Sequence, residues 1–392
     1  MRYAFIHGFY WPLLCCSFSF GAVFFLSKGY SNSQTGAVLA AASILAVLAQ
    51  PAAAAFADRP GRVSMKQLIL ILSAVGAVLA VVRFFCSNLA IVPAVLFILE
   101  QAAVYALQPL MNALAVQVMN SGGKINFGLS RGIGSITYAV ISILLGIFLR
   151  TEKTDVLPLF SVIFYVAYVV AVFKFPAAGR SESKKEMPHE PGRDSAAGYP
   201  PRRKTNVRFL LLLLAVVCAF CSQSMIGNFL IQIEKHVGGT AENVGIANGL
   251  SAAIELPAMA VFGLLIRKFR SGTLLKISFA GFVCKALATM AAPSVAALYL
   301  VQIFQFSAYA LFIPASVYYA NEIIPESSLA KGQAALTSAA TFGAVAANLL
   351  GGWILDGFGV AAMLLASVLS AAAGFAVGLP AVRRTQPKNS RT

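Results

Sequence analysis

Four charged residues of this sequence lie inside long apolar runs, where a charge is hardest to accommodate. They are Glu100, Arg131, Glu255 and Lys285. If those runs cross a membrane, an unpaired charge at the bilayer centre costs about 2.5 to 3.5 kcal/mol. Two acids and two bases balance each other, so we expect pairing within a helix bundle. The set fits either fixed ion pairs between helices or a polar site that binds a solute and carries a proton.

Glu255 is the strongest candidate for a proton carrier in this set. A glutamate in a dry pocket holds a proton more tightly than one in water, so it can load and release a proton near neutral pH. Pro257 follows closely and should loosen the helix beside Glu255. Lys285 lies at a matching depth in the next apolar run and is the expected partner. Glu100 is the second candidate for the proton.

Arg131 and Tyr138 are the best candidates for substrate contacts. They are seven residues apart in one run, so on a helix they share a face two turns apart. A guanidinium offers a rigid fork of donors, and an aromatic ring offers a flat apolar platform. This pair would suit a sugar, a nucleoside or an aromatic acid, unless Tyr138 is an ordinary packing residue. Asn112 and Gln305 are polar residues in other apolar runs, and either could bind substrate or bond two helices.

The elements that must position these residues are membrane-spanning helices. The chain has 392 residues, 59% hydrophobic and 11% charged, whereas soluble domains carry roughly 25% charged residues. Its apolar residues recur in runs long enough to cross a hydrocarbon core of about 30 Å. The sequence therefore predicts an all-α membrane protein with twelve transmembrane helices, at roughly 5–27, 34–57, 67–86, 89–118, 126–149, 155–177, 207–232, 242–266, 273–292, 294–320, 330–354 and 360–380.

The longest polar segment divides the helices into two sets of six. Residues 179–206 are rich in Lys, Arg, Glu, Ser, Pro and Gly, which predicts a flexible linker between halves 1–178 and 207–382. A basic tail, 383–392, follows. The halves echo each other, because Gln50-Pro51 and Leu256-Pro257 stand at corresponding places. Two such halves are expected to pack around a central cavity that binds the substrate.

The distribution of basic residues predicts the orientation in the membrane. The net charge is +16, and most basic residues fall in alternate breaks between the runs. The positive-inside rule then predicts a multi-pass protein of the cell (inner) membrane with both termini in the cytoplasm. Basic residues without interleaved aromatics do not form a nucleic-acid surface. The breaks assigned to the outer side contain few basic residues, namely Lys28, Arg83, Arg150, Lys153 and Lys235.

Residues 31–62 resemble the second helix and following loop of the major facilitator superfamily. Asp58, Arg59, Gly61 and Arg62 fit the inward-loop motif of that superfamily, whose charges latch neighbouring helix ends. The stretches PLMNALAV, NFGLSRGIGSITYAV, AIELPAMAVFGLLIRKF and AKGQAALTSAATFGAVAANLLGGWILDGFG are similar to one branch. That branch holds proton-coupled oligosaccharide symporters and phenylpropionate-permease-like transporters.

The resemblance also implies roles for individual residues. Arg131 falls at a substrate-binding arginine, Tyr138 at an aromatic that stacks on sugar, and Asn112 at a substrate-binding acid that is neutral here. Glu255 falls at a substrate-contacting glutamate and Lys285 at a basic residue of the proton-coupling group. Where those symporters carry a histidine and a proton-carrying glutamate, this chain has Gln305 and Ala308. Proton coupling, if it exists, must then run through Glu255 or Glu100.

Together these features predict a transporter that imports a small organic solute by alternating access, coupled to protons. Efflux of drugs or metabolites and facilitated diffusion remain open as alternatives. The expected partners are a small-molecule substrate, the proton and the lipid bilayer, and the expected state is a monomer. The three histidines lie near helix ends or in polar segments, and we find no phosphate loop or metal motif. We therefore expect no enzyme activity, cofactor, metal or nucleic-acid partner.

Overall fold

The computed structural model describes residues 2–57, 63–89, 91–120, 122, 125, 127–150, 154–175, 207–324 and 329–382. All regular structure within these residues is helical, because a chain in lipid must satisfy its backbone hydrogen bonds internally. The helices are α1 (Arg2–Leu14), α2 (Gly21–Ser27), α3 (Asn32–Ala57), α4 (Met65–Phe85), α5 (Val92–Asn120), α6 (Phe127–Leu149), α7 (Val156–Lys174), α8 (Val207–Asn228), α9 (Leu230–His236), α10 (Ala241–Lys268), α11 (Ser271–Met290), α12 (Val295–Val301), α13 (Leu311–Ile323) and α14 (Leu329–Ala381).

The described residues contain 11 helical segments long and apolar enough to cross a membrane. The last of them, Gly332–Ala381, has 50 residues, and one span needs only about 20. Gly359, with a φ of 80°, interrupts the helical conformation of α14 and divides this segment into two spans. The predicted all-α architecture of twelve transmembrane helices is thus confirmed.

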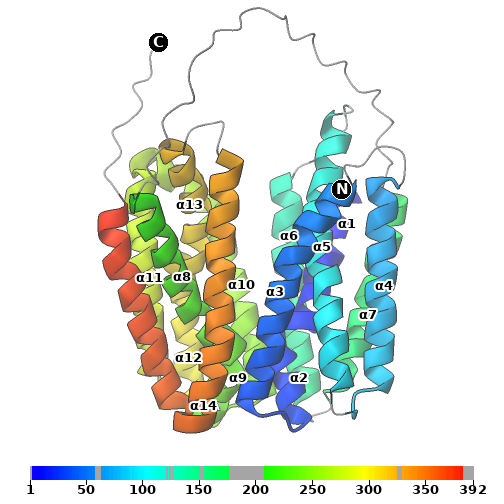
Figure 1. The fold of residues 1–392 in the computed structure, drawn as a ribbon, viewed down its shortest axis with the longest axis horizontal. Coiled ribbons are helices and arrows are strands. Elements are labelled where there is room, and N and C mark those ends of the chain that lie inside the picture. The colour runs from blue at the N-terminus through cyan, green and yellow to red at the C-terminus, as the bar shows by residue number, and fades with distance from the viewer. Residues whose placement is uncertain are drawn as a thin grey trace, which may run out of the picture.

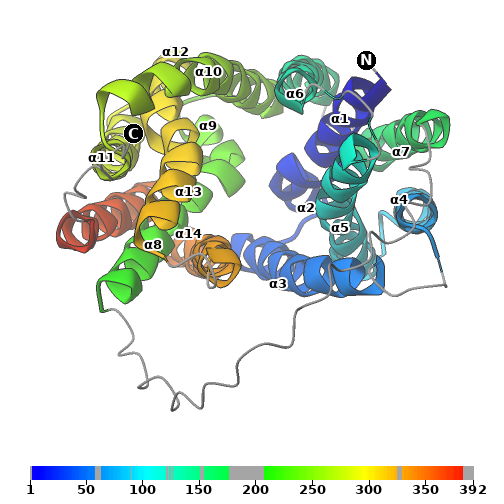
Figure 2. The same cartoon turned by 90° about the horizontal axis from the view of Figure 1, so that it is seen from above.

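The helices form two bundles that face each other (Figure 1). Helices α1–α7 make up the first bundle and α8–α14 the second, as the view from above shows (Figure 2). Each bundle has a buried apolar core, and a third apolar cluster joins residues of both bundles, among them Phe24 and Ile231. We call the end of the molecule where α1 begins the Arg2 end, and the end where α14 turns the Gly359 end.

The two bundles meet through small residues at the Gly359 end. A Cβ on Gly36 of α3 would collide with the backbone carbonyl of Asn348 on α14. A Cβ on Gly245 of α10 would likewise collide with the carbonyl of Ser142 on α6, whose hydroxyl donates to the Gly245 carbonyl over 3.0 Å. Only glycine allows backbones to approach this closely. The bundles therefore converge at this end and diverge toward the Arg2 end (Figure 1).

Polar contacts reinforce the closure at the Gly359 end. The Asp356 carboxylate on α14 accepts hydrogen bonds from the backbone N–H groups of Asn32 (3.0 Å) and Ser33 (2.7 Å) and from the Asn32 amide (2.8 Å). The Gln232 amide also donates to Asn32. All of these hydrogen bonds join the second bundle to the start of α3, so they hold the two bundles together at the Gly359 end.

Candidate functional site

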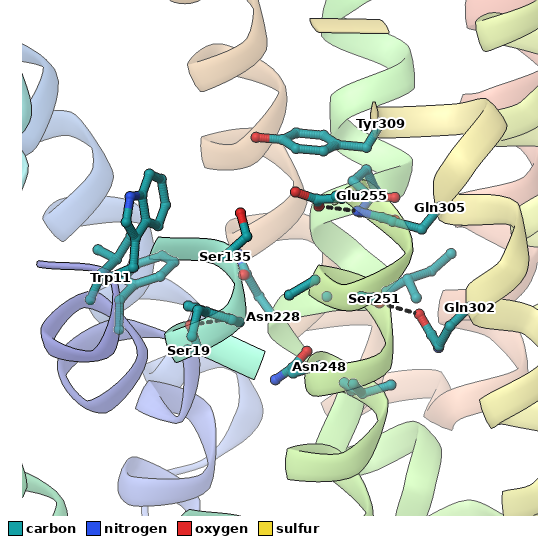
Figure 3. Close-up of a pocket in the computed structure, with 18 of the residues that line it drawn as sticks. Trp11, Ser19, Ser135, Asn228, Asn248, Ser251, Glu255, Gln302, Gln305 and Tyr309 are labelled. Atoms are coloured by element: carbon teal, nitrogen blue, oxygen red, sulfur yellow. Dashed lines mark hydrogen bonds between the residues drawn. The ribbon is translucent and has the colours of Figure 1, made fainter. Parts of the chain in front are cut away.

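A cavity of about 320 Å³ lies between the two bundles. The first bundle contributes α1, α6 and the π-helical turn Cys15–Ser19. The second contributes α8, the start of α9, α10, α11 and the irregular segment Gln302–Ala310. Figure 3 shows Trp11, Ser19 and Ser135 on one side, facing Glu255 and Tyr309 on the other. We call this space the central cavity. Its walls come from both bundles, so relative motion of the bundles would reshape it.

Arg131 lies on α6 and faces the central cavity. Its guanidinium carbon sits 3.9 Å from the ring centroid of Trp11 on α1, and its Nη1 donates to Ser135 Oγ over 2.7 Å. Stacking on an indole stabilises the cation through the negative face of the ring. The ion pairs of the described residues do not include Arg131. Its charge therefore faces the cavity with an aromatic neighbour and no bonded carboxylate.

A chain of hydrogen bonds fixes the orientation of Trp11. The indole N–H can only donate, so His7 Nδ1 must accept this bond of 3.1 Å. A neutral His7 ring then carries its proton on Nε2 and donates to Tyr3 Oη over 3.1 Å. The Tyr3 hydroxyl in turn reaches Asn112 Oδ1 at 3.2 Å. Asn112 thus lies at the far end of this chain and does not line the central cavity.

Gln305 bridges the acid and the base of the second bundle. Its amide nitrogen donates to Glu255 Oε1 over 3.0 Å, and its carbonyl oxygen accepts from Lys285 Nζ over 2.5 Å. Gln223 on α8 also accepts from Lys285 at 3.3 Å. Glu255 and Lys285 are therefore connected through one neutral amide, without a direct ion pair. We call Glu255, Gln305 and Lys285 the amide bridge.

Irregular helix positions both walls of the cavity. Gln305 ends a 3₁₀ turn (Gln302–Gln305), which passes directly into a π-helical turn (Phe306–Ala310). The first bundle has its own π-helical turn, Cys15–Ser19, and Ser19 Oγ bonds the Tyr138 hydroxyl at 2.8 Å. Such turns are uncommon and often occur at functional sites. They bring Gln305 and Ser19 to the cavity from segments that hydropathy describes only as apolar.

Glu100 lies elsewhere, in a buried ion pair with Arg83. The Arg83 Nη2 and Glu100 Oε2 atoms are 2.8 Å apart, and the side chains are 1% and 0% exposed. The guanidinium also lies over the rings of Phe24 and Phe97. Arg83 is within α4, at its last turn, and not in a loop as its place in the sequence suggested. Neither residue lines the central cavity.

A second cavity, of about 480 Å³, adjoins the central one. The two share Phe18, Gln223, Asn228 and Tyr309 as lining residues. The second cavity extends toward the Arg2 end between α3 and α14, and its described lining residues include no charged side chain. Its polar groups are amides and hydroxyls, mainly those of Gln50, Gln108, Gln333, Thr337 and Thr341. We call it the neutral cavity.

Five of the residues singled out in the sequence line the central cavity together, namely Arg131, Tyr138, Glu255, Lys285 and Gln305. Asn112 and Glu100 do not. The motif residues Asp58, Arg59, Gly61 and Arg62 lie outside the described residues. Sequence reasoning missed Trp11 and His7, although Trp11 is one of only two tryptophans and stands four residues after a histidine.

Known membrane transporters are similar to this chain in sequence and in fold. The family model described as "MFS_1 like family" matches residues 1–371. A maltose permease of Geobacillus stearothermophilus is 26% identical over 361 residues, which cover 89% of this chain and 87% of that protein. A mutant form of the nucleoside transporter NupG superposes with a TM-score of 0.79 at 13% identity, covering 97% and 98% of the two chains. An auto-inhibited peptide transporter of the POT family has a TM-score of 0.76 at 12% identity, covering 100% and 98%. The two structural similarities concern the fold alone.

Proposed function

Because this chain belongs to the MFS_1 like family of membrane transporters, we propose that it imports a small polar organic solute together with a proton. The observation that supports this most is the amide bridge of Glu255, Gln305 and Lys285, which faces Arg131 across a cavity between two bundles. A titratable acid and a free set of donors in one cavity are what a coupled transporter needs. The maltose permease is consistent with a polar organic solute.

Alternating access would occur by movement of the two bundles against each other. The Gly359 end is closed by α3 against α14 and by α6 against α10, while the neutral cavity extends toward the Arg2 end. The positive-inside rule would put the Arg2 end on the cytoplasmic side of the cell membrane. The described conformation then corresponds to an inward-facing state. Halves 1–178 and 207–382 would be the moving bodies, connected by 179–206.

Glu255 would hold the transported proton. In the described arrangement the Gln305 amide donates to its carboxylate, and the ammonium group of Lys285 lies just beyond that amide. Both neighbours stabilise the ionised acid and oppose the effect of burial, which favours the protonated form. A change in the position of Gln305 would remove that support and favour proton uptake. Gln305 ends a 3₁₀ turn and is followed by a π-helical turn, so a local change of helix type in this segment would move its amide.

Proteoliposome uptake tests this role of Glu255. We expect wild-type protein to accumulate its solute when an inward proton gradient is imposed, and Glu255→Gln to lose accumulation while still exchanging solute down its own gradient. Glu322→Gln is the matched control, because it removes an exposed carboxyl from α13 that does not line the cavity. Accumulation by Glu255→Gln equal to that of wild type would refute proton carriage by Glu255.

Facilitated diffusion is the second candidate, favoured by one specific feature. Gln305 and Ala308 cannot titrate, although they stand where related symporters carry a histidine and an acid. A uniporter would equilibrate its solute at the same rate with or without a proton gradient. The same uptake experiment therefore separates the two candidates.

A further inference from the structure

A buried carboxyl group at the Gly359 end takes no part in the central cavity. Glu234 lies on α9, and its side chain is 0% exposed. Neither of its carboxyl oxygens has a hydrogen-bond partner among the described residues, and the ion pairs of those residues do not include Glu234. A carboxyl group buried without a partner takes up a proton, because the isolated charge is too costly to bury. Glu234 is therefore a neutral acid in the described arrangement.

Glu234 belongs to the face of α9 that packs at the junction of the two bundles. Leu230 and Ile231 precede it by four and three residues, so they share its face of the helix. Both belong to the apolar cluster that joins the bundles, and Leu230 also lines the central cavity. Gln232 on the same helix donates to Asn32 of α3. Glu234 thus lies one helical turn beyond the central cavity, toward the Gly359 end (Figure 1).

The immediate surroundings of the Glu234 carboxyl offer it no donor. A Cβ on Gly239, in the turn after α9, would lie 2.7 Å from Glu234 Oε2 and 3.1 Å from Val295 Cγ2, so the carboxyl occupies the space that this glycine leaves. The backbone N–H of Gly239 is already used, because it donates to the backbone carbonyl of Glu234 over 2.7 Å. Lys235 and His236 of the same helix are exposed.

The titratable groups on the neighbouring helices do not compensate Glu234 either. Tyr299 on α12 interacts electrostatically with Glu234 and with Glu242 on α10. Glu242 is paired with the exposed Arg150 of the first bundle at 3.5 Å. The end of α8 contains no titratable side chain, and α14 contributes Asp356, whose carboxylate is bonded to the start of α3. Each of these groups is exposed or bound to another partner, so none of them stabilises an ionised Glu234.

We propose that Glu234 is a second proton-binding site of this protein, protonated while the bundles are closed at the Gly359 end and ionised when they open there. Opening would separate α9 from α3 and admit water to the face of α9 that carries Glu234. The proton of Glu234 then exchanges with the outer side of the membrane, whereas the proton of Glu255 crosses with the solute. Proton binding at Glu234 favours closure, so an acidic medium on the outer side drives the molecule toward the described arrangement.

The pH range of this effect follows from burial. Burial raises the pKa of Glu234 to about 7 in the closed arrangement, whereas a glutamate in water titrates near about 4.3. The closed state binds more protons than the open state between these two values, so rising pH favours opening. The contribution of Glu234 to closure is complete below about pH 4 and is lost as the pH rises to about 7. Within that interval the ratio of closed to open protein should fall by up to about tenfold per pH unit.

Distances between spin labels on the two bundles test the proposal in purified protein. With labels at the exposed positions Leu89 and Phe358 in a cysteine-free background, the long-distance population of the wild type should grow as the pH rises from about 5 to about 8. Glu234→Gln, which cannot ionise, and Glu234→Leu, which also removes the buried polar group, should stay closed across this range. His236→Gln is the matched control on the exposed side of α9, because imidazoles titrate in the same range. A wild type that does not respond to pH, or a response that survives in both Glu234 variants or disappears in His236→Gln, would overturn the proposal.

Two further arms separate Glu234 from Glu255 and the proton from a metal ion. In Glu255→Gln the pH response of the distances should persist, which would support the second site whether or not Glu255 carries a proton in transport. A response lost in Glu255→Gln and kept in Glu234→Gln would place the titration in the central cavity and refute this inference, while leaving the proposed function intact. Replacing sodium by choline at constant pH should leave the populations unchanged. A pH response that requires sodium would indicate a metal ion at Glu234 and would refute a proton site.

Discussion

Asp356 offers the sharpest test of the closure at the Gly359 end. Its carboxylate on α14 receives the backbone N–H groups of Asn32 and Ser33, at the N-terminus of α3 in the opposite bundle. An acid at that place bonds unpaired backbone donors and opposes the positive end of the helix dipole. These bonds exist only while the two bundles are together at this end. Asp356→Ala should therefore shift the molecule toward a state that is open at the Gly359 end.

The size of the shift follows from the bonds that are lost. Removing a capping side chain costs about 0.5–2 kcal/mol, and hydrogen bonds to charged groups contribute about 1.5–3 kcal/mol each. Asp356 is exposed, so hydrogen bonds to water replace part of the lost hydrogen bonds, and the lower of these two ranges applies. We expect a change of about 1–2 kcal/mol, which alters the ratio of the two states by a factor of about 5–30.

Acidification should have the same effect at an extreme pH. Partial burial alone would raise the pKa of the Asp356 carboxyl, but hydrogen bonds from Ser33 and Asn32 outweigh it and lower the pKa to about 2. An unperturbed aspartate titrates near about 3.9. The closed state therefore binds fewer protons, so the contribution of Asp356 to closure is complete above about pH 4 and is lost as the pH falls toward 2.

Distances between spin labels measure the opening directly. Labels at Leu89 and Phe358 report on the two bundles, because both side chains are exposed near the Gly359 end, at 54% and 66%. In a cysteine-free background, Asp356→Ala should enlarge the long-distance population. Asp155→Ala is the matched control, since Asp155 pairs with Lys28 inside the first bundle. A distribution unchanged by Asp356→Ala, or changed equally by Asp155→Ala, would refute the reasoning.

Two further predictions concern the first bundle. Glu100→Gln should lower the free energy of unfolding by about 3–5 kcal/mol, because it leaves Arg83 buried without its partner. Thermal unfolding measures the loss. Recovery of stability in a double variant with both residues replaced by Met would confirm the cause. His7→Phe should weaken solute binding by about fivefold, as expected from one lost hydrogen bond to Trp11 of about 1 kcal/mol. Solute affinity can be measured by tryptophan fluorescence in a Trp353→Phe background, where only Trp11 emits. An affinity for the solute unchanged by His7→Phe would show that His7 does not position the indole.

Hydropathy predicted the helices well because the requirement it reflects is simple. A segment in lipid must be apolar and must satisfy its own backbone, so length and composition are enough to identify it. The same signal gives the depth of a residue but not the direction in which its side chain points. Glu100 and Glu255 therefore looked alike in the sequence, although one lies inside a bundle against Arg83 and the other faces the central cavity. Arg83 itself stands at the end of an apolar run, where an outward loop was the simpler interpretation.

The contacts of the central cavity depend on features that no linear pattern contains. Trp11 reaches Arg131 because α1 packs on α6, at a distance of 120 residues along the chain. Ser19 and Gln305 face the cavity because the helices that carry them contain π-helical or 3₁₀ turns, which rotate the following side chains. Regular helical periodicity cannot foresee such a rotation. Candidate residues could thus be named from the sequence, but their partners could not.

Gln305 shows how the structure changes the meaning of a substitution. In the sequence alone, an amide where related symporters carry a titratable residue indicates only that Gln305 does not relay a proton. In the structure, the two ends of that amide are used differently, since its nitrogen donates to Glu255 and its oxygen accepts from Lys285. A histidine can also donate at one nitrogen and accept at the other, but it can gain a charge beside Lys285. An amide keeps the same bridge at every pH. Any change in the protonation of this network must therefore occur on Glu255 or Lys285, which is why Glu255→Gln is the decisive variant.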